Sequence, residues 1–568
     1  MKTNPTEKNV IKNREELIYA LCEAAEIEHG LTCVYLFTAF SMKKTLDEGI
    51  NEIQQDKIRN WKSVILRVAH QEMEHLGLVC NLLNAIGGPQ HFDRPNFPQS
   101  KEYYQTAVDL VLSKFSLDTM ASFMAFEKPD ITPTDDYDLN LNQIVPVPIV
   151  IHNGHTVQEL YEAILNGFIY LDGKIDLFIG NEASQVDGDD INVGFANREF
   201  GITMIDVVDL KTAKQAICEI IEQGEGVILR GDAVKEDNKN LTELYEKFDL
   251  QMNALNVPVI DENHWPEAVT QVVKISESIV VLLEESLQYI QQYPKNRAII
   301  EQAVSTIVPS IIELQKIAAE DYSPENAQKA NDLRTGINSA ALNDAEGAIL
   351  YEIVVEKNCH YLRFWDLYQD LKSELSKPNN FEPSRNVADN PMLRRHEDTT
   401  NAKNVNIVEY EYTRKVLELF NAGYETMVDM LIIFFANDGI TADQRTLFMN
   451  TAFFPLMTMF IRPVGEILTM LPLAVDDEKP MDALRAGGSF ECYINTALMP
   501  RTKKEWVYLN ERLQDMAVLG EDLQDPDDDL RKYLSESAFS FLQGQMKFLY
   551  VNLKRIRENF SLGKNPQS

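Results

Sequence analysis

The chain has 568 residues, 45% of them hydrophobic, so it is long enough to bury a large core. Its 88 Asp and Glu outnumber its 53 Lys and Arg, and a formal net charge of −35 argues against nucleic-acid and anionic-membrane partners. The six cysteines form no Cys-x-x-Cys pair and the N-terminus has no apolar signal core. We therefore expect reduced thiols in a cytoplasmic protein.

The first predicted helix, residues 14–43, carries a carboxylate where its core-facing stripe should be apolar. That stripe consists of Leu17, Leu21, Ala24, Glu28, Leu31 and Tyr35. A buried carboxylate is costly unless it is protonated, paired with a cation or bound to a metal. Glu28 is therefore a candidate ligand. Tyr35, on the same face, is either a core residue or a catalytic hydrogen-bonding or radical-relay residue beside the site.

The second predicted helix, residues 58–86, repeats this anomaly. Val68, Glu72, His75 and Val79 share one stripe, and residues three apart on a helix can hold one ion together. A Glu-x-x-His pair alone is typical of an ordinary half-exposed helix face. Its place in the stripe, and the matching Glu28, favour half of a carboxylate-bridged dimetal site in a four-helix bundle.

Further helices are expected at 103–126, 156–170 and about 210–223, and a Pro- and Asp-rich loop at 128–153. Residues 231–343 are predicted to be an inserted helical hairpin, with helices at Glu267–Tyr293 and Arg297–Ala319.

A helix from Ala345 to about Leu371 follows. Its stripe consists of Glu346, Ile349, Ile353, Glu356, His360 and Phe364. A single buried histidine is more often a core residue than a ligand, but the recurrence on a third helix favours metal binding by Glu356 and His360.

The remainder divides into a polar segment and a mainly helical region. Residues 371–404 are expected to wrap the surface as a linker, and residues 405–568 to pack as additional helices. The apolar stretch Thr446–Val475 contains prolines and charges, which predicts a buried helical hairpin and no membrane span. Its Phe and Met runs are typical of core, with an apolar substrate tunnel as the alternative.

Several motifs together resemble a known family. They are AAEIEHGLTCVYLFTAFSMK, VAHQEMEHLGLVCNLLNAIGG, TVQELYEAI, EQGEG, CHYLRF and AGGSFECY. They resemble the bacterial ferritin-like family that includes iminophenylpyruvate dimer synthase of violacein-type pigment pathways. The resemblance implies an all-α fold, a ferritin-like four-helix bundle at residues 10–370 with the inserted hairpin and additional C-terminal helices. For the named members it implies iron-dependent oxidative coupling of amino-acid-derived imines.

Carried over to this sequence, the resemblance implies a set of metal ligands. They are Glu28, Glu72, His75, Glu159, Glu225 and His360. Glu159 lies off the apolar stripe of its helix, which includes Leu160 and Tyr161, and Thr156-x-x-Glu159 is equally typical of a capping box, so Glu162 stays an alternative. The predicted insertion separates Glu225 from His360, so Glu356 stays an alternative to Glu225.

Carboxylate and imidazole ligands suit two ions of iron, or manganese. We expect an O2- or peroxide-dependent oxidase acting on a small amino-acid-derived or aromatic substrate. The alternative is a non-catalytic ferritin-like metal-binding or scaffold protein; iron storage fits the long, irregular chain poorly. Haem stays open as a cofactor because its non-covalent binding needs no attachment motif. A homodimer is compatible with the sequence.

Overall fold

The computed structural model describes residues 11–104, 106–129, 157–180, 185–188, 204–224, 226, 239–290, 293–354, 358–378, 381–394, 404–436, 445–446, 448–492 and 503–562. The described chain is mainly helical, as predicted. It divides into two compact units. Unit 1 comprises Met1–Ser122, Leu141–Ile220 and Glu374–Ser568, and unit 2 comprises Phe123–Asn140 and Ile221–Ser373.

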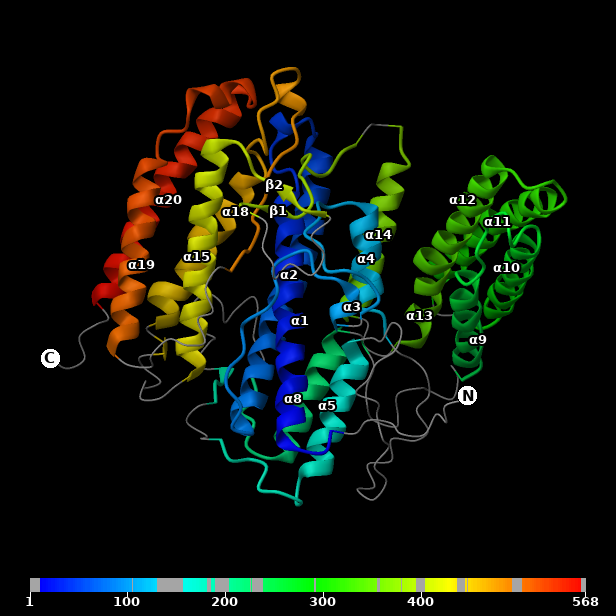
Figure 1. Ribbon diagram of the computed structural model, residues 1–568, viewed down its shortest axis with the longest axis horizontal. Helices are drawn as coiled ribbons and strands as arrows, with labels where there is room; N and C mark the ends of the chain where they lie inside the picture. Colours follow the sequence, from blue (N-terminus) through cyan, green and yellow to red (C-terminus); the bar gives the residue numbers. More distant parts are fainter. Residues whose placement is uncertain are drawn as a thin grey trace. The chain divides into compact units, whose positions relative to one another are not determined.

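Two long helices, α1 (Arg14–Ser41) and α2 (Glu52–Ala85), lie side by side in unit 1 (Figure 1). The Asn13 side chain caps α1 by accepting a hydrogen bond from the backbone N–H of Glu16. Asn51 and Gln54 form a capping box that starts α2 six residues before the predicted position. Both helices bury most of their second half, where the anomalous stripe residues lie.

The prediction of one helix at residues 103–126 is wrong. The structure has α3 (Lys101–Tyr104) and α4 (Leu117–Phe126), separated by extended chain. The backbones of Gln99 and Leu110 exchange two hydrogen bonds of 2.9 Å, and Leu112 pairs with Asn390 through backbone and side chain. These long-range bonds replace the local bonds that a helix would make.

The helix predicted at 156–170 is observed as α5 (Val157–Leu171), which packs against α1. The helix predicted at 210–223 is α8 (Leu210–Gly224). Two short strands, β1 (Pro391–Met392) and β2 (Asn406–Ile407), pair in parallel.

The C-terminal helices belong to unit 1, where α18 packs on α1 and on α15 (Figure 1, yellow to red). Unit 2 ends at Ser373 and unit 1 resumes at Glu374, and the domain boundaries that the sequence analysis proposed stay a prediction. The helices of this region are α15 (Glu411–Ala436), η6 (Met449–Phe453), α17 (Phe454–Leu456), η7 (Met457–Ile461), α18 (Arg462–Leu468), α19 (Lys503–Asp522) and α20 (Glu536–Leu562). Short 3₁₀ helices lie at η1 (Leu46–Glu48), η8 (Pro480–Asp482) and η10 (Asp528–Lys532).

The predicted hairpin at 446–475 is wrong, because Met449–Leu468 forms one continuous helical run. Pro455 and Pro463 each lie in the first turn after a π-helical stretch, and the wider π turns accommodate the prolines. Among the described residues, this run is the one long and apolar enough to cross a membrane by length and composition. It packs on helices of unit 1, and 50% of the tested window is buried, as a core helix would be.

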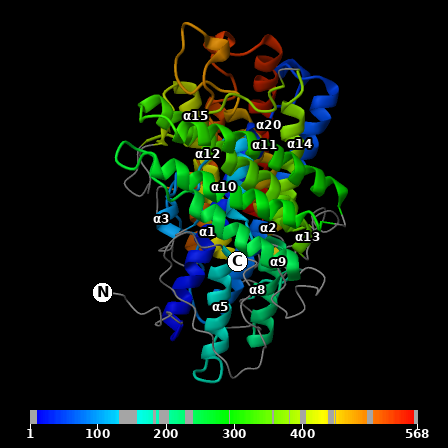
Figure 2. The same ribbon diagram turned by 90° about the vertical axis from the view of Figure 1, so that its right-hand side faces the viewer.

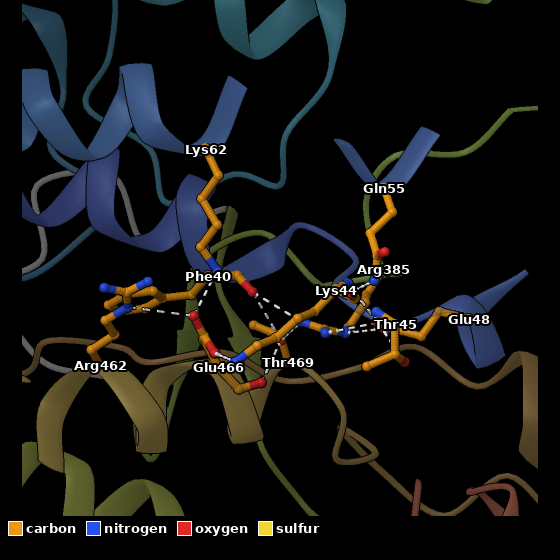
Figure 3. A network of polar contacts seen from close by, with 10 residues as sticks. All are labelled: Phe40, Lys44, Thr45, Glu48, Gln55, Lys62, Arg385, Arg462, Glu466 and Thr469. Carbon is orange, nitrogen blue, oxygen red and sulfur yellow. Dashed lines mark hydrogen bonds and ion pairs between the residues drawn. The ribbon is translucent and has the colours of Figure 1, made fainter. Parts of the chain in front are cut away.

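A network of charges connects the end of α1 with α2 and α18 (Figure 3). Glu466 on α18 contacts Lys62 on α2 at 2.6 Å and Lys44 at 3.1 Å. Arg385 contacts Glu48 at 2.5 Å and donates hydrogen bonds to the carbonyl of Phe40 and the hydroxyl of Thr469. Ion pairs between distant segments thus hold one end of unit 1 together.

Unit 2 contains more than the predicted hairpin, because four helices pack together in it (Figure 2). Helix α10 contacts α9 and α11, and α11 contacts α12. The helices of this region are α9 (Lys239–Leu255), α10 (Glu267–Ser286), α11 (Pro294–Ala318), α12 (Pro324–Ser339), the π-helical η4 (Ala340–Glu346), α13 (Gly347–Ile353) and α14 (His360–Leu375).

The continuous helix predicted from Ala345 to Leu371 is also wrong. It stops at Val354, whose ψ of 136° is not helical, and α14 starts at His360. Ile353 and Val354 are β-branched and form helices poorly. Gly226, with φ +76°, approaches so closely that a Cβ there would lie 2.6 Å from Val354 Cγ1. Local propensity and a tertiary contact therefore both favour the break.

Candidate metal centre

The packing of α1 on α2 brings three predicted site residues of unit 1 together. Glu28 lies on α1, and Glu72 and His75 lie three residues apart on α2. Each of these residues is 1% exposed. The polar residues that interrupt the apolar stripes of α1 and α2 therefore lie together inside the core, as their positions on the helices predicted.

The three side chains lie within reach of a single ion. His75 Nδ1 is 3.0 Å from Glu72 Oε2 and 3.6 Å from Glu28 Oε2. One ligand atom from each residue lies within 4.8 Å of the other two. From α5, the buried Tyr161 hydroxyl donates a hydrogen bond of 2.5 Å to Glu28 Oε1. That bond engages one oxygen of the carboxylate, and the other oxygen lies toward His75 on α2.

Burial and charge perturb both titratable partners in this core. Burial raises the pKa of Glu28 to about 7, against the opposing effect of its contact with His75. Burial also lowers the pKa of His75, but its contacts with Glu28 and Glu72 outweigh burial and hold that pKa well above its usual value. The two glutamates thus favour the protonated form of the imidazole when no ion is bound.

The donor set fits a transition-metal ion. Two carboxylates and one imidazole suit iron or manganese. Glu28 Oε2 is buried and accepts no standard hydrogen bond from the described residues, so this oxygen is available to an ion. Tyr161 supports Glu28 as hydrogen-bonded neighbours commonly support ligating carboxylates.

The other predicted residues have different outcomes. Tyr35 is fully buried on α1, and its role stays a prediction. Glu159 and Glu162 on α5 are half-buried, and neither belongs to the described group of Glu28 and its two partners. Their contribution as ligands therefore also stays a prediction.

Glu225 and Glu356 lie outside the described residues. Glu356 was expected on one helical stripe with Ile353 and His360; Ile353 ends α13 and His360 begins α14, and the role of Glu356 itself stays a prediction.

His360 lies in unit 2, at the start of α14, and is fully buried. Its Nδ1 is 3.6 Å from Glu127 Oε2, and Glu127 is 6% exposed. Sequence reasoning missed Glu127. The available signal was an acidic residue directly after the apolar helix that ends at Phe126.

Sequence reasoning also treated Tyr161 only as part of the apolar stripe of α5. A tyrosine in a buried stripe needs a partner for its hydroxyl, and this signal could have singled it out.

Comparison with known proteins identifies the fold of this region. A family model described as Ferritin-like matches residues 21–255. The matched region contains Glu28, Glu72, His75 and Tyr161, so the predicted resemblance and the all-α fold are confirmed.

Two curated relatives match part of the chain. The 2-imino-3-(indol-3-yl)propanoate dimerase of Chromobacterium violaceum is 25% identical over 283 residues, which cover 44% of this chain and 26% of that protein. The dichlorochromopyrrolate synthase of Lentzea aerocolonigenes is 25% identical over 254 residues, 40% of this chain and 24% of that protein. The matched region thus spans about a quarter of each relative's length.

A solved ferritin-like protein from Caulobacter vibrioides is also similar, with 16% identity and a TM-score of 0.26. The match covers 44% of this chain and 87% of that one.

Proposed function

We propose that this protein is a ferritin-like dimetal oxidase that uses iron or manganese with O2 or peroxide. The observation that carries the proposal is the buried group of Glu28, Glu72 and His75, whose ligand atoms lie within 4.8 Å of one another. Two carboxylates buried beside one histidine are costly in an apolar core, and metal ligation is one established way to stabilise them.

Each residue of the group has a distinct part in this proposal. Glu28, Glu72 and His75 would hold an ion between α1 and α2, and Tyr161 keeps the Glu28 carboxylate oriented through its 2.5 Å hydrogen bond. A bound iron or manganese pair would supply one-electron redox chemistry with oxygen. The surrounding core excludes bulk water, which strengthens the electrostatic interactions at the site. His360 and Glu159 stay proposed ligands on the sequence evidence.

The substrate class is proposed from the relatives. Both relatives are named for reactions on compounds of amino-acid-derived or aromatic character. We propose a small substrate of that kind for this chain.

Metal content tests the proposal most directly. Full-length protein purified without chelators is measured by plasma mass spectrometry and compared with Glu72→Gln and His75→Ala. The matched control is Glu491→Gln, which also neutralises a fully buried carboxylate; Glu491 accepts hydrogen bonds from Asn421 and Ser489.

We expect about two iron or manganese ions per chain in the wild type and the control, and loss in both site variants. A wild type that binds no metal even after anaerobic iron loading contradicts the proposal.

A second candidate function, a metal-free scaffold, is favoured by one observation. His75 lies 3.0 Å and 3.6 Å from two carboxylates, so an internal ion pair can hold α1 and α2 together by itself. If the protein is a scaffold, we expect His75→Ala to lower the melting temperature of metal-free protein. If it is an oxidase, we expect removal of the metal to lower the melting temperature of the wild type.

A further inference from the structure

The outer face of the helices α19 and α20 in unit 1 exposes large apolar side chains. The two helices lie side by side, α19 also contacts α15, and α20 contacts η6 (Figure 1, orange to red). Their opposite sides expose five apolar side chains by 38% to 60%: Val507, Val518, Phe541, Phe548 and Val551. Among the described residues, Phe541 and Phe548 are the phenylalanines with more than a third of their surface exposed. Grouped exposed apolar side chains are typical of an interaction surface.

The exposed residues of α20 follow the spacing of a helix that packs against another helix. Phe541, Gly544, Phe548 and Val551 are separated by three, four and three residues, so they form one stripe along α20. A Cβ at Gly544 would meet no atom within 4 Å. The stripe is therefore low at this glycine and leaves room for a large side chain of a partner helix.

The exposed charges along the two helices have opposite signs. Those of α19 are acidic: Glu511, Asp515, Glu521 and Asp522. Those along the α20 stripe are mainly basic: Lys547, Lys554, Arg555 and Glu558. A chain with a formal net charge of −35 repels its own copies unless the contact surfaces have complementary charge. The basic stripe of α20 fits an acidic partner, and α19 of a second copy is one.

We propose that this α19–α20 face is the interface of a homodimer, in which α19 of each copy lies against α20 of the other. The two copies are related by a twofold axis, so the same surface is used twice. In each of the two contacts the exposed valines of α19 meet the phenylalanine stripe of α20, and the acidic residues face the basic ones. None of the proposed metal ligands lies on this face, so the proposal is independent of the oxidase activity.

The size of the face is that of a reversible dimer. Helix α19 has 20 residues and α20 has 27. The shared length is thus about 30 Å, and two helices side by side are about 20 Å wide. Each copy would bury about 600 Å², or about 1,200 Å² in total, which is the lower end of the range for specific interfaces. We therefore expect a dimer that dissociates on dilution.

Sedimentation velocity of the full chain, from about 1 to 100 μM, tests the proposal. The wild type should sediment as two chains at the highest concentration and shift toward one chain on dilution. Phe548→Glu places a charge in the centre of the face and should raise the dissociation constant at least about 30-fold. Ile53→Glu is the matched control, because Ile53 on α2 is 74% exposed and lies outside the face.

Two outcomes of this measurement overturn the proposal. A wild type that stays monomeric at every concentration would assign the face to a different protein. An equal effect of Phe548→Glu and Ile53→Glu would show that the dimer forms elsewhere on the molecule.

Charge reversal tests which helices meet. One variant carries Glu511→Lys and Asp515→Lys, which makes α19 basic, and the other carries Lys554→Glu and Arg555→Glu, which makes α20 acidic. Either variant alone brings like charges together in both contacts and should stay monomeric. An equimolar mixture restores opposite charges in both contacts and should dimerise. All four positions are exposed, and circular dichroism checks that the helical content is kept. A mixture that stays monomeric, or a single variant that dimerises like the wild type, refutes the pairing of α19 with α20.

Discussion

Replacement of Glu466 by Gln should destabilise unit 1 by removing the centre of a buried charge network (Figure 3). Glu466 is 13% exposed and contacts Lys62, which is equally buried, and the more exposed Lys44 and Arg462. The substitution keeps the shape of the side chain. It leaves the Lys62 ammonium buried without its carboxylate partner, which is the costly way to break an ion pair.

The magnitude follows from the pKa values. Burial raises the pKa of Glu466, but the ion pairs with Lys62 and Lys44 outweigh burial and lower it from 4.5 to about 2. That shift corresponds to about 3 kcal/mol of stability. For Lys62 burial dominates and lowers the pKa from 10.5 to about 8, a cost of similar size. The intact pair therefore changes the stability of the fold little, whereas loss of one partner lowers that stability.

Thermal unfolding measures this effect. Unit 1 has roughly 400 residues, so its unfolding entropy is on the order of 0.8 kcal/mol/K and a loss of about 3 kcal/mol lowers the melting temperature by about 4 °C. The control is the double variant with Lys62→Met, which removes both charges and should recover most of the loss.

The pH dependence provides a second check. Because the folded-state pKa of Glu466 is depressed, its contribution is complete above about pH 4.5 and is lost as the pH falls toward 2. At pH 3 the wild type and Glu466→Gln should differ by less than about half of the difference at pH 7. A Glu466→Gln variant that melts within 1 °C of the wild type at pH 7, or a difference that does not shrink in acid, refutes the reasoning.

Three further predictions concern the metal centre and the core. Tyr161→Phe removes the hydrogen bond to Glu28 and should weaken metal affinity about 10- to 100-fold in a chelator competition; unchanged affinity would contradict the orienting role. Because burial raises the pKa of Glu28 to about 7, protons compete with the metal below that pH, and metal affinity should fall by about tenfold per pH unit in an anaerobic titration. An affinity that stays constant from pH 7.5 to 5.5 argues against Glu28 as a ligand. Gly465→Ala places a Cβ 2.4 Å from Phe40, and the resulting clash of about 1–3 kcal/mol should lower the melting temperature, whereas Gly544→Ala, with open space around it, should not. Equal melting temperatures of the two variants would refute the close approach at Gly465.

Much of the fold could be predicted because helical periodicity is a local property. The limits of α1 and α5 lie within two residues of those predicted, since caps and apolar stripes lie within the helix sequence itself. The wrong predictions share a cause. At 103–126, backbone pairing with distant residues competes with helix formation, and at Val354 the approach of Gly226 accompanies the break.

The candidate site could likewise be predicted only in part from the sequence. The stripes on α1 and α2 single out Glu28, Glu72 and His75 because a charge on an apolar face is visible in sequence. Their role as ligands stays a prediction, whereas their proximity is a property of the folded chain.

The sequence by itself determined the all-α class and the faces of α1 and α2 that carry polar groups, because both depend on residues within a few turns of each other. Only the tertiary structure decided that Tyr161 donates to Glu28, that Glu127 lies beside His360, and that His91 contacts Glu26. These contacts join segments far apart in the chain. Their formation depends on how whole helices pack, which no local pattern encodes.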